Sequence, residues 1–288
     1  MKRGTQKIGL GTGTLASVGR GTSAKMVDAL LGAARDLGIV VIDTADSYTS
    51  GRCESLLGAS LAGRRDDFSL VTKAGYRHGN LPAPLGFANP YLKRAYRVMG
   101  RSQCFDPAYL AKCLDRSLIR LKTDHVEAFL LHDPPPEALA DPQLLEALEG
   151  LRKAGKTIDI GISTLRADVI PRLPDAPAFT ILECPLSLLI DPTLSDFWKS
   201  GHAAGLELVA NHVFFSGSIP ESGHLPEIAG RLGFSMHELL MRFAASHPGT
   251  GTILTGTRNP AHLGECVRWA KSPLTQEDAA AVTTALAS

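Results

Sequence analysis

Ionisable side chains end a series of short apolar runs in this sequence. Asp43 ends "IVVID" and is followed by Tyr48, Lys73 ends "FSLVTK", and His132 ends "VEAFLLH". Taken singly, each has a simple structural explanation as a helix cap, a solvated lysine or a hydrogen-bonded core histidine. Taken together they favour a site, because the carboxyl ends of parallel strands meet at one mouth of a barrel.

These four residue types are suited to proton transfer. An unperturbed tyrosine, with a pKa of about 10, is a weak proton donor near neutral pH. A nearby ammonium favours the phenolate, so Lys73, held in place and kept charged by Asp43, is expected to lower the pKa of Tyr48. His132 is placed to donate a hydrogen bond to a carbonyl oxygen. Such a set protonates an alkoxide as it forms, or accepts its proton in the reverse direction, and needs a hydride carrier for a redox reaction.

Two other classes of function use the same strand ends. A metal-dependent barrel hydrolase or isomerase would take as ligands Asp43, His132, Glu183 and His212. That hypothesis leaves Tyr48 and Lys73 without a role, and no HxH pair occurs on a predicted strand, so no metal site is predicted. The remaining class is a catalytically weak, cofactor-binding sensor or accessory protein of the same fold, which an intact proton-transfer set argues against.

Apolar runs alternate with amphipathic segments along the chain. The predicted strands cover residues 7–13, 38–45, 68–74, 126–133, 157–164, 179–185, 206–213 and 251–257. The predicted helices cover residues 23–38, 53–63, 106–122, 141–155, 192–205, 225–248 in two pieces, and 259–270. Most strands are too apolar to alternate, which is typical of parallel strands covered on both faces. A strand–helix unit every ~34 residues predicts an α/β fold of the (β/α)8 TIM-barrel type rather than a doubly wound open sheet.

Composition sets the remaining bounds. The chain is 44% hydrophobic and 20% charged with a net charge of +1, so it offers no electrostatic reason to bind nucleic acid or a membrane surface. It has no apolar run of the roughly 18 residues that span a membrane and no signal-peptide pattern. Its odd number of cysteines without a CxxC pair favours reduced thiols in a cytoplasmic protein. We expect residues 1–288 to form one barrel domain, with residues 75–105 as a long loop or lid after the third strand.

The glycine-rich run "GLGTG" (residues 9–13) is not a dinucleotide-binding fingerprint, because its third glycine comes one residue too early for GxGxxG. Phosphates of any bound nucleotide are therefore expected at late barrel loops.

In combination the motifs resemble the aldo-keto reductase superfamily over nearly the whole chain. "IDTADSYTSGRCESLLG" resembles that family's signature, "VTKAG" its lysine strand and "DHVEAFLLHDP" its histidine strand. The resemblance implies a barrel oxidoreductase that binds NAD(P) in extended form across the barrel mouth. It places the catalytic tetrad on Asp43, Tyr48, Lys73 and His132, with Tyr48 as the general acid/base.

The resemblance also implies a set of cofactor-binding positions, which are Ser163, Thr164, Glu183, Asn211, Gly256, Thr257, Arg258, His262 and Glu265. The chain departs from the family at several of them. Thr164 stands where Asn is usual, Glu183 where Gln is usual, and Asn211 near the place where many members have a stacking aromatic; Cys266 also replaces a usual Asn.

Arg258 suits a 2′-phosphate, which favours NADP over NAD. Within the family, the chain resembles the branch that holds aldose and pyridoxal dehydrogenases. The resemblance lies in the forms "LLHDP" and "FFSG" and in the long segment after Lys73. The implied substrate is therefore a small carbonyl, alcohol or sugar. The physiological substrate, the direction of reaction and the oligomeric state do not follow from these residues.

Overall fold

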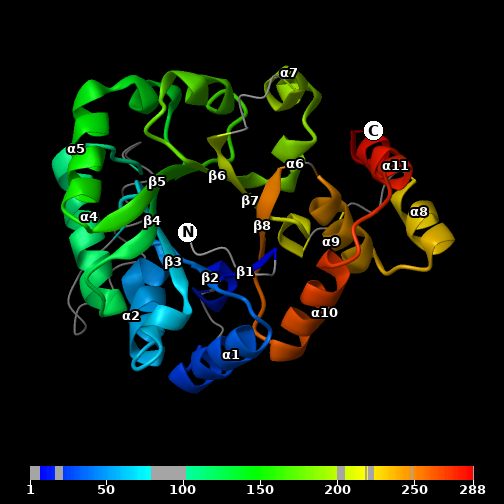
Figure 1. Ribbon diagram of the computed structural model, residues 1–288, viewed down its shortest axis with the longest axis horizontal. Coiled ribbons are helices and arrows are strands. Elements are labelled where there is room, and N and C mark those ends of the chain that lie inside the picture. Colours follow the sequence, from blue (N-terminus) through cyan, green and yellow to red (C-terminus); the bar gives the residue numbers. More distant parts are fainter. Residues whose placement is uncertain are drawn as a thin grey trace.

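A computed structural model describes residues 7–16, 22–78, 102–199, 205–217, 219, 224–247 and 249–287. Within these residues, parallel strands β1 to β8 close into a barrel in sequence order. The strands are β1 (Ile8–Gly11), β2 (Val41–Asp43), β3 (Ser69–Ala74), β4 (Val126–His132), β5 (Thr157–Ser163), β6 (Ile181–Pro185), β7 (Glu207–Asn211) and β8 (Thr250–Thr255). The predicted (β/α)8 fold is confirmed (Figure 1).

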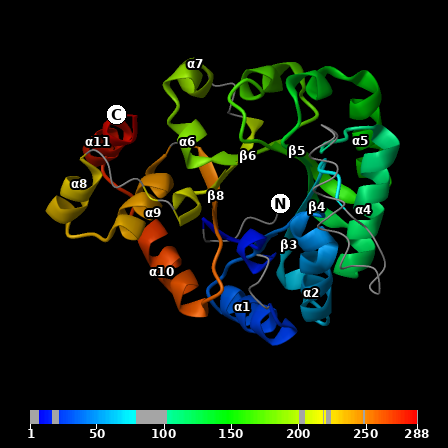
Figure 2. The same cartoon turned by 180° about the vertical axis from the view of Figure 1, so that it is seen from behind.

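Helices lie outside the ring of strands in both views (Figures 1 and 2). They are α1 (Ala24–Asp36), α2 (Arg52–Ser60), α4 (Pro107–Leu121), α5 (Pro142–Lys153), α6 (Leu186–Leu189), α7 (Ser195–Lys199), α8 (Leu225–Leu232), α9 (Met236–Ser246), α10 (Pro260–Ala270) and α11 (Gln276–Ala287). Short 3-10 turns include η1 (Gly13–Ala16) and η2 (Tyr48–Gly51). None of the helices in the described part of the chain is long and apolar enough to cross a membrane.

The Asp-Pro starts of two helices act as the sequence predicts. The side chain of Asp106 accepts a hydrogen bond from the backbone N–H of Tyr109 at 2.8 Å, and Asp141 accepts from Gln143 N at 2.9 Å. A proline at the first helical position follows each cap, where its missing N–H removes no helical hydrogen bond.

Several predicted elements are longer than the observed ones. Strand β2 covers 41–43 rather than 38–45, because Gly38 (φ 74°) still belongs to the turn that ends α1. The helix predicted over 192–205 is a 3-10 turn (Pro192–Leu194) followed by α7, and residues 200–204 lie outside the described residues. Helix α11 was not predicted, because its alanine-rich sequence has no apolar stripe.

The hydrophobic core has two shells. The larger lies between the barrel and its helices, and the smaller fills the barrel interior. The inner shell consists of Val41, Val71, Ala128, Leu130, Ile181, Val209 and Leu254. Burying a side chain of this size contributes roughly 1.5–3 kcal/mol. This packing explains Gly9, since a Cβ at this position would lie 2.8 Å from Leu254 Cδ2.

Side chains two residues beyond the inner shell face the same way, because direction alternates along a strand with a period of two. Applied to successive strands, this places one ring of side chains above the inner shell at the carboxyl ends of the strands. We call this ring the mouth layer; it contains Asp43, Lys73, His132, Ser163, Glu183 and Asn211. The register supports it, since His132 pairs with Ser163, and Ser163 with Glu183.

The segment predicted as a lid, residues 75–105, is described only at its two ends. Tyr76 and Gln103 form an antiparallel bridge, and the N–H of Cys104 donates to Gly75 O at 2.7 Å. Residues 79–101 lie outside the described residues, so the lid stays a prediction.

Candidate active site

The loop after β2 brings Tyr48 back over the barrel mouth. It is tied to β3 by hydrogen bonds from Thr44 N to Val71 O (2.9 Å) and from Asp46 N to Lys73 O (3.0 Å). Directly after Tyr48, the backbone adopts left-handed conformations at residues 49–51, with φ values of 47°, 53° and 85°. Non-glycine residues in this region cost of order 1 kcal/mol each, so packing around the loop must hold this sharp turn in place.

Lys73 is fully buried and surrounded by oxygen atoms. Its ammonium pairs with Asp43, lies 3.3 Å from Glu183 Oε2, and donates to the Thr44 carbonyl oxygen at 3.1 Å. Burial acts to lower the pKa of Lys73, but the two carboxylates outweigh it and raise that pKa above its ordinary value. The expected pairing of Asp43 with a charged Lys73 is therefore confirmed.

Tyr48 and His132 complete the group. The Lys73 Nζ lies 5.7 Å from the centroid of the Tyr48 ring. The rings of Tyr48 and His132 meet edge to face with centroids 6.2 Å apart, and Tyr76 meets His132 in the same way at 4.9 Å. The four residues singled out in the sequence are thus brought close together at the barrel mouth.

The expected lowering of the Tyr48 pKa is wrong. The charge of Lys73 is the largest single influence and does lower it, but burial and the carboxylates of Asp43 and Glu183 raise the pKa of Tyr48 above its ordinary value on balance. The physical reason is that burial disfavours the charged phenolate, and that the carboxyl groups of Asp43 and Glu183 oppose the field of Lys73 at the phenol. Tyr48 is accordingly a protonated phenol at neutral pH.

Glu183 is a second buried carboxylate at the centre of the mouth layer. Asn211 Nδ2 donates to its Oε1 at 2.7 Å, while Oε2 faces Lys73. Burial and the nearby Glu183 raise the pKa of Asp43 to about 8, against the opposing effect of Lys73. Sequence reasoning assigned Glu183 and Asn211 to the cofactor and did not foresee that both belong to the lysine network.

A loop after β4 joins His132 to the positions after β5. Asp133 Oδ1 accepts from Thr164 Oγ1 (3.3 Å) and from the N–H of Leu165 (3.0 Å), and its Oδ2 accepts from the Tyr76 hydroxyl at 3.0 Å. Burial and the Asp133 carboxylate raise the pKa of Tyr76 to about 12. Thr164 therefore supports this loop, and Tyr76, which the sequence analysis missed, stands beside the catalytic candidates.

A second missed feature is a buried pair beneath the same loop. Asp46 Oδ2 lies 3.2 Å from His78 Nε2, with both side chains 1% exposed. The pair links the Tyr48 loop to the chain beyond β3, in keeping with the expectation that Asp46 supports the loop. Its signal in the sequence was only a histidine five residues after Lys73.

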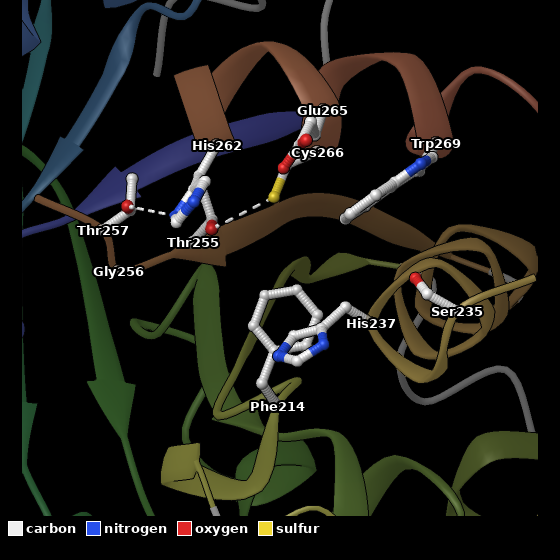
Figure 3. Close-up of a pocket in the computed structure, with 10 residues that line it drawn as sticks. All are labelled: Phe214, Ser235, His237, Thr255, Gly256, Thr257, His262, Glu265, Cys266 and Trp269. Atoms are coloured by element: carbon white, nitrogen blue, oxygen red, sulfur yellow. Dashed lines mark hydrogen bonds between the residues drawn. The ribbon is translucent and has the colours of Figure 1, made fainter. Parts of the chain in front are cut away.

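Beyond β8 the chain lines a pocket of about 430 Å³ (Figure 3). Its walls come from the end of β8, the start of α9, one side of α10 along its length, and the loop after β7. The lining residues are Phe214, Ser235, His237, Thr255, Gly256, Thr257, His262, Glu265, Cys266 and Trp269. Four predicted cofactor residues, Gly256, Thr257, His262 and Glu265, are among them. Arg258 is half-buried and is not one of the lining residues.

The pocket has an aromatic wall and a polar wall. The rings of Phe214 and His237 lie 5.1 Å apart, facing the α10 side in Figure 3. Opposite them, Thr257 Oγ1 and His262 Nδ1 are 3.3 Å apart, and Thr255 Oγ1 lies 3.4 Å from Cys266 Sγ. Phe214 and His237 were not predicted, although "FFSG" and "SMHE" carry them.

The residues present fit a nucleotide cofactor. The pocket lies beside the first turn of α10, where the positive end of the helix dipole favours phosphate, and aromatic and apolar side chains suit a base. In the mouth layer, Asn211 Oδ1 is buried without a hydrogen-bond partner among the described residues, as is Thr44 Oγ1. Buried polar atoms of this kind are normally satisfied, so a ligand amide is a chemically suitable partner there.

The residues of the metal hypothesis have other contacts. Asp43 and Glu183 both face Lys73, and the part of the chain that the structure describes gathers no three potential ligands of the His, Cys, Asp and Glu types. The cysteines are free thiols. Burial raises the pKa of Cys53, whose Sγ approaches Thr12 O at 3.7 Å, which agrees with the expectation of an inert thiol.

A closed parallel barrel with Asp43, Tyr48, Lys73 and His132 gathered at its carboxyl end agrees with the family resemblance drawn from the motifs. The family model described as "Aldo/keto reductase family" matches residues 7–222 and 209–287, and the chain belongs to that family. Among curated proteins, pyridoxal 4-dehydrogenase of Microbacterium luteolum is 26% identical, covering 94% of this chain and 91% of its own length. D-threo-aldose 1-dehydrogenase of a Pseudomonas species is 29% identical, covering 83% and 75%.

Solved structures agree in fold. The aldo-keto reductase AKR11C1 from Bacillus halodurans (holo form) superposes with a TM-score of 0.74 at 24% identity, covering 96% of this chain and 91% of its own. An aldo/keto reductase from Klebsiella pneumoniae in complex with NADP and acetate superposes with a TM-score of 0.71 at 22% identity, covering 96% and 90%. The resemblance inferred from the motifs, including the aldose and pyridoxal dehydrogenase branch, is confirmed.

Proposed function

We propose that the protein is an NADP-dependent oxidoreductase that interconverts a small carbonyl compound and its alcohol, or oxidises a sugar hemiacetal, with Tyr48 as general acid/base. The observation that carries the proposal is the convergence of Tyr48, Lys73 and His132 at the barrel mouth, with Asp43 paired to the lysine. A bound nicotinamide supplies or accepts the hydride.

The side chains have separate tasks in the proton transfer. In the reducing direction, His132 donates a hydrogen bond to the carbonyl oxygen, and the Tyr48 hydroxyl gives its proton to that oxygen as the alkoxide forms. The resulting phenolate is stabilised by the Lys73 ammonium. The raised pKa of Tyr48 keeps the phenol protonated before this step, and an alkoxide is basic enough to take the proton. In the oxidising direction the same atoms return the proton to Tyr48.

The choice of NADP rests on the pocket beyond β8. The Thr257 hydroxyl and the His262 ring line this pocket and can donate hydrogen bonds to phosphate, and the amino-terminal end of α10 adds the positive end of its dipole. We assign Arg258 a supporting electrostatic role there, since it is adjacent to Thr257 but does not line the pocket. NADP in the Klebsiella pneumoniae structure supports this choice, and the pyridoxal and aldose relatives support a small polar carbonyl or sugar as substrate.

The test is the variant Tyr48→Phe. We expect NADPH affinity, followed by fluorescence, to stay within about twofold of wild type, while turnover over a panel of small aldehydes, ketones and sugars falls by roughly 10²–10⁴-fold. Tyr109→Phe is the matched control, because the Tyr109 hydroxyl donates to the Tyr76 backbone carbonyl oxygen at 3.3 Å and is not part of the Lys73 network, so this variant should turn over normally.

Two results would overturn the proposal. Near-normal turnover in Tyr48→Phe would remove the assigned proton donor. Well-folded wild-type protein that binds NADPH but turns over nothing in the panel would instead indicate a cofactor-binding accessory protein.

A further inference from the structure

The buried cluster of Asp43, Lys73 and Glu183 holds two carboxyl groups for one ammonium. Their side chains are 5%, 0% and 3% exposed. The proton-transfer scheme uses Asp43 to fix Lys73 and leaves Glu183 without a task. A second buried carboxylate costs free energy through desolvation and repulsion from the first, unless a proton or a cation compensates it.

The groups around Glu183 determine what can compensate its negative charge. Lys73 on β3 faces both carboxyl groups, and Asn211 on β7 donates to Glu183 Oε1 without changing the charge. The other titratable groups packed around the cluster are Tyr48 after β2, His132 on β4, Cys53 at the start of α2 and Cys184 beside Glu183 on β6. Tyr48 and both thiols have raised pKa values and are neutral near pH 7. Once both carboxyl groups are ionised, the cluster therefore carries one surplus negative charge.

Oxidised and reduced nicotinamide differ in charge at the ring. The oxidised ring is a cation and the reduced ring is neutral, while the phosphates and the adenosine half are the same. A fixed negative charge near the ring therefore changes the affinity for one form and not the other. Resting on the proposed function, we propose that Glu183 makes this site favour the oxidised cofactor over the reduced one, the cationic ring compensating its charge.

The geometry is suited to this role. Glu183 is in the mouth layer, between Ser163 on β5 and Asn211 on β7. Its carboxylate is contacted on both sides, by Asn211 at Oε1 and by Lys73 at Oε2, and its side chain is buried. A held carboxylate in a poorly solvated place exerts a stronger field than a mobile one.

The preference for the oxidised form grows with pH. At acidic pH Asp43 holds a proton, which cancels the surplus charge. The pKa of Asp43, raised to about 8, places the loss of that proton in the neutral to mildly alkaline range. Binding of the oxidised form near pH 7 then expels the proton, and binding of the reduced form leaves it in place.

The experiment measures dissociation constants for NADP⁺ and NADPH at pH 6.5 and pH 8.5 in wild type and in Glu183→Gln. At pH 8.5 the variant should lose about tenfold in NADP⁺ affinity, equivalent to about 1.4 kcal/mol, with NADPH affinity within about threefold. The matched control is Glu127→Gln, which removes a buried carboxylate paired with Arg65 at 3.0 Å on the amino-terminal half of β4. In Glu127→Gln the ratio of the NADP⁺ and NADPH dissociation constants should equal that of wild type.

A second readout needs no variant. Calorimetry in two buffers of different ionisation enthalpy should show proton release when wild type binds NADP⁺ near pH 7.5, and none when it binds NADPH. A folded Glu183→Gln protein with a wild-type ratio of constants, or equal proton exchange with the two nucleotides, would overturn the inference and leave the oxidoreductase proposal standing. Failure of wild type to bind either nucleotide would overturn both.

Discussion

The Lys73 ammonium lies 3.3 Å from Glu183 Oε2 on β6, while it also pairs with Asp43 on β2. One buried cation on β3 therefore contacts carboxyl groups from two other strands, β2 and β6. Lys73 lowers the pKa of Tyr48, but burial of the phenol and the two carboxyl groups that share the lysine raise it on balance. The sharing also ties the stability of the barrel mouth to the same charges that serve the proposed reaction.

Removing Lys73 should destabilise the fold as well as stop turnover. In Lys73→Met, Asp43 and Glu183 lose the cation that both contact, and breaking a buried pair typically costs about 3–5 kcal/mol. Denaturant unfolding at pH 8 should show a loss of this order. The double variant Lys73→Met with Glu183→Gln should recover part of it, because one of the two repelling charges is gone.

A surface pair provides the control for that measurement. Lys156 Nζ lies 2.6 Å from Asp115 Oδ1, with the two side chains 35% and 48% exposed. Exposed pairs contribute at most about 1 kcal/mol, so Lys156→Met should change the unfolding free energy far less than Lys73→Met. Equal losses in the two variants would contradict the picture of a buried, shared cation.

The raised pKa of Asp43 also predicts how stability depends on pH. The folded protein holds the Asp43 proton up to about pH 8, against an ordinary value of 3.8, so the folded state binds more protons than the unfolded chain between these values. The resulting stabilisation is complete below about pH 4 and is lost as pH rises through about 8. Wild type should therefore lose unfolding free energy relative to Asp43→Asn between pH 5 and pH 9, measured in urea; a relative gain would show that the pKa is lowered instead.

The same substitution at two glycines should have opposite effects. A Cβ on Gly161 in β5 would lie 2.5 Å from the Ile181 carbonyl oxygen and 2.7 Å from Leu130 Cδ2, whereas a Cβ on Gly150 in α5 meets nothing within 4 Å. Gly161→Ala should cost about 2 kcal/mol or more through overpacking. Gly150→Ala should stabilise by about 0.5–1 kcal/mol through helix propensity.

Thermal and urea unfolding of both variants provide the measurement. Gly161→Ala should in addition impair turnover, because a displaced β5 moves Ser163 within the mouth layer. A Gly161→Ala protein as stable as wild type would contradict this prediction, since it would show that β5 shifts to accommodate the methyl group at little cost in unfolding free energy.

Much of the fold was accessible from the sequence because its signals are local. Apolar runs of strand length predict eight parallel strands, and Asp-Pro starts predict the beginnings of α4 and α5. The site residues of the tetrad follow from reading strand ends, since closing a parallel barrel gathers those ends whatever the intervening loops do.

What escaped the sequence depends on pairing across the barrel. Glu183 reads as a strand-end carboxylate, and only the closed barrel shows that it shares Lys73 with Asp43 and so raises the Tyr48 pKa. The contact between Asp46 and His78 likewise joins two loops whose mutual approach has no sequence signal. Helix α11 escaped for a different reason, because alanine-rich segments carry helix propensity without an apolar stripe to mark them.

The alternation between inner shell and mouth layer has a consequence for how such a protein changes over time. Each of several strands contributes one residue that holds the barrel together and, two positions later, one that does chemistry. A substitution in the mouth layer changes the groups that face the site, while the inner shell keeps its packing. The site can therefore change in evolution without loss of the barrel core. Glu183, two residues after Ile181, is one such position. The free-energy cost of its buried carboxylate depends on the neighbouring charges rather than on the packing of the inner shell.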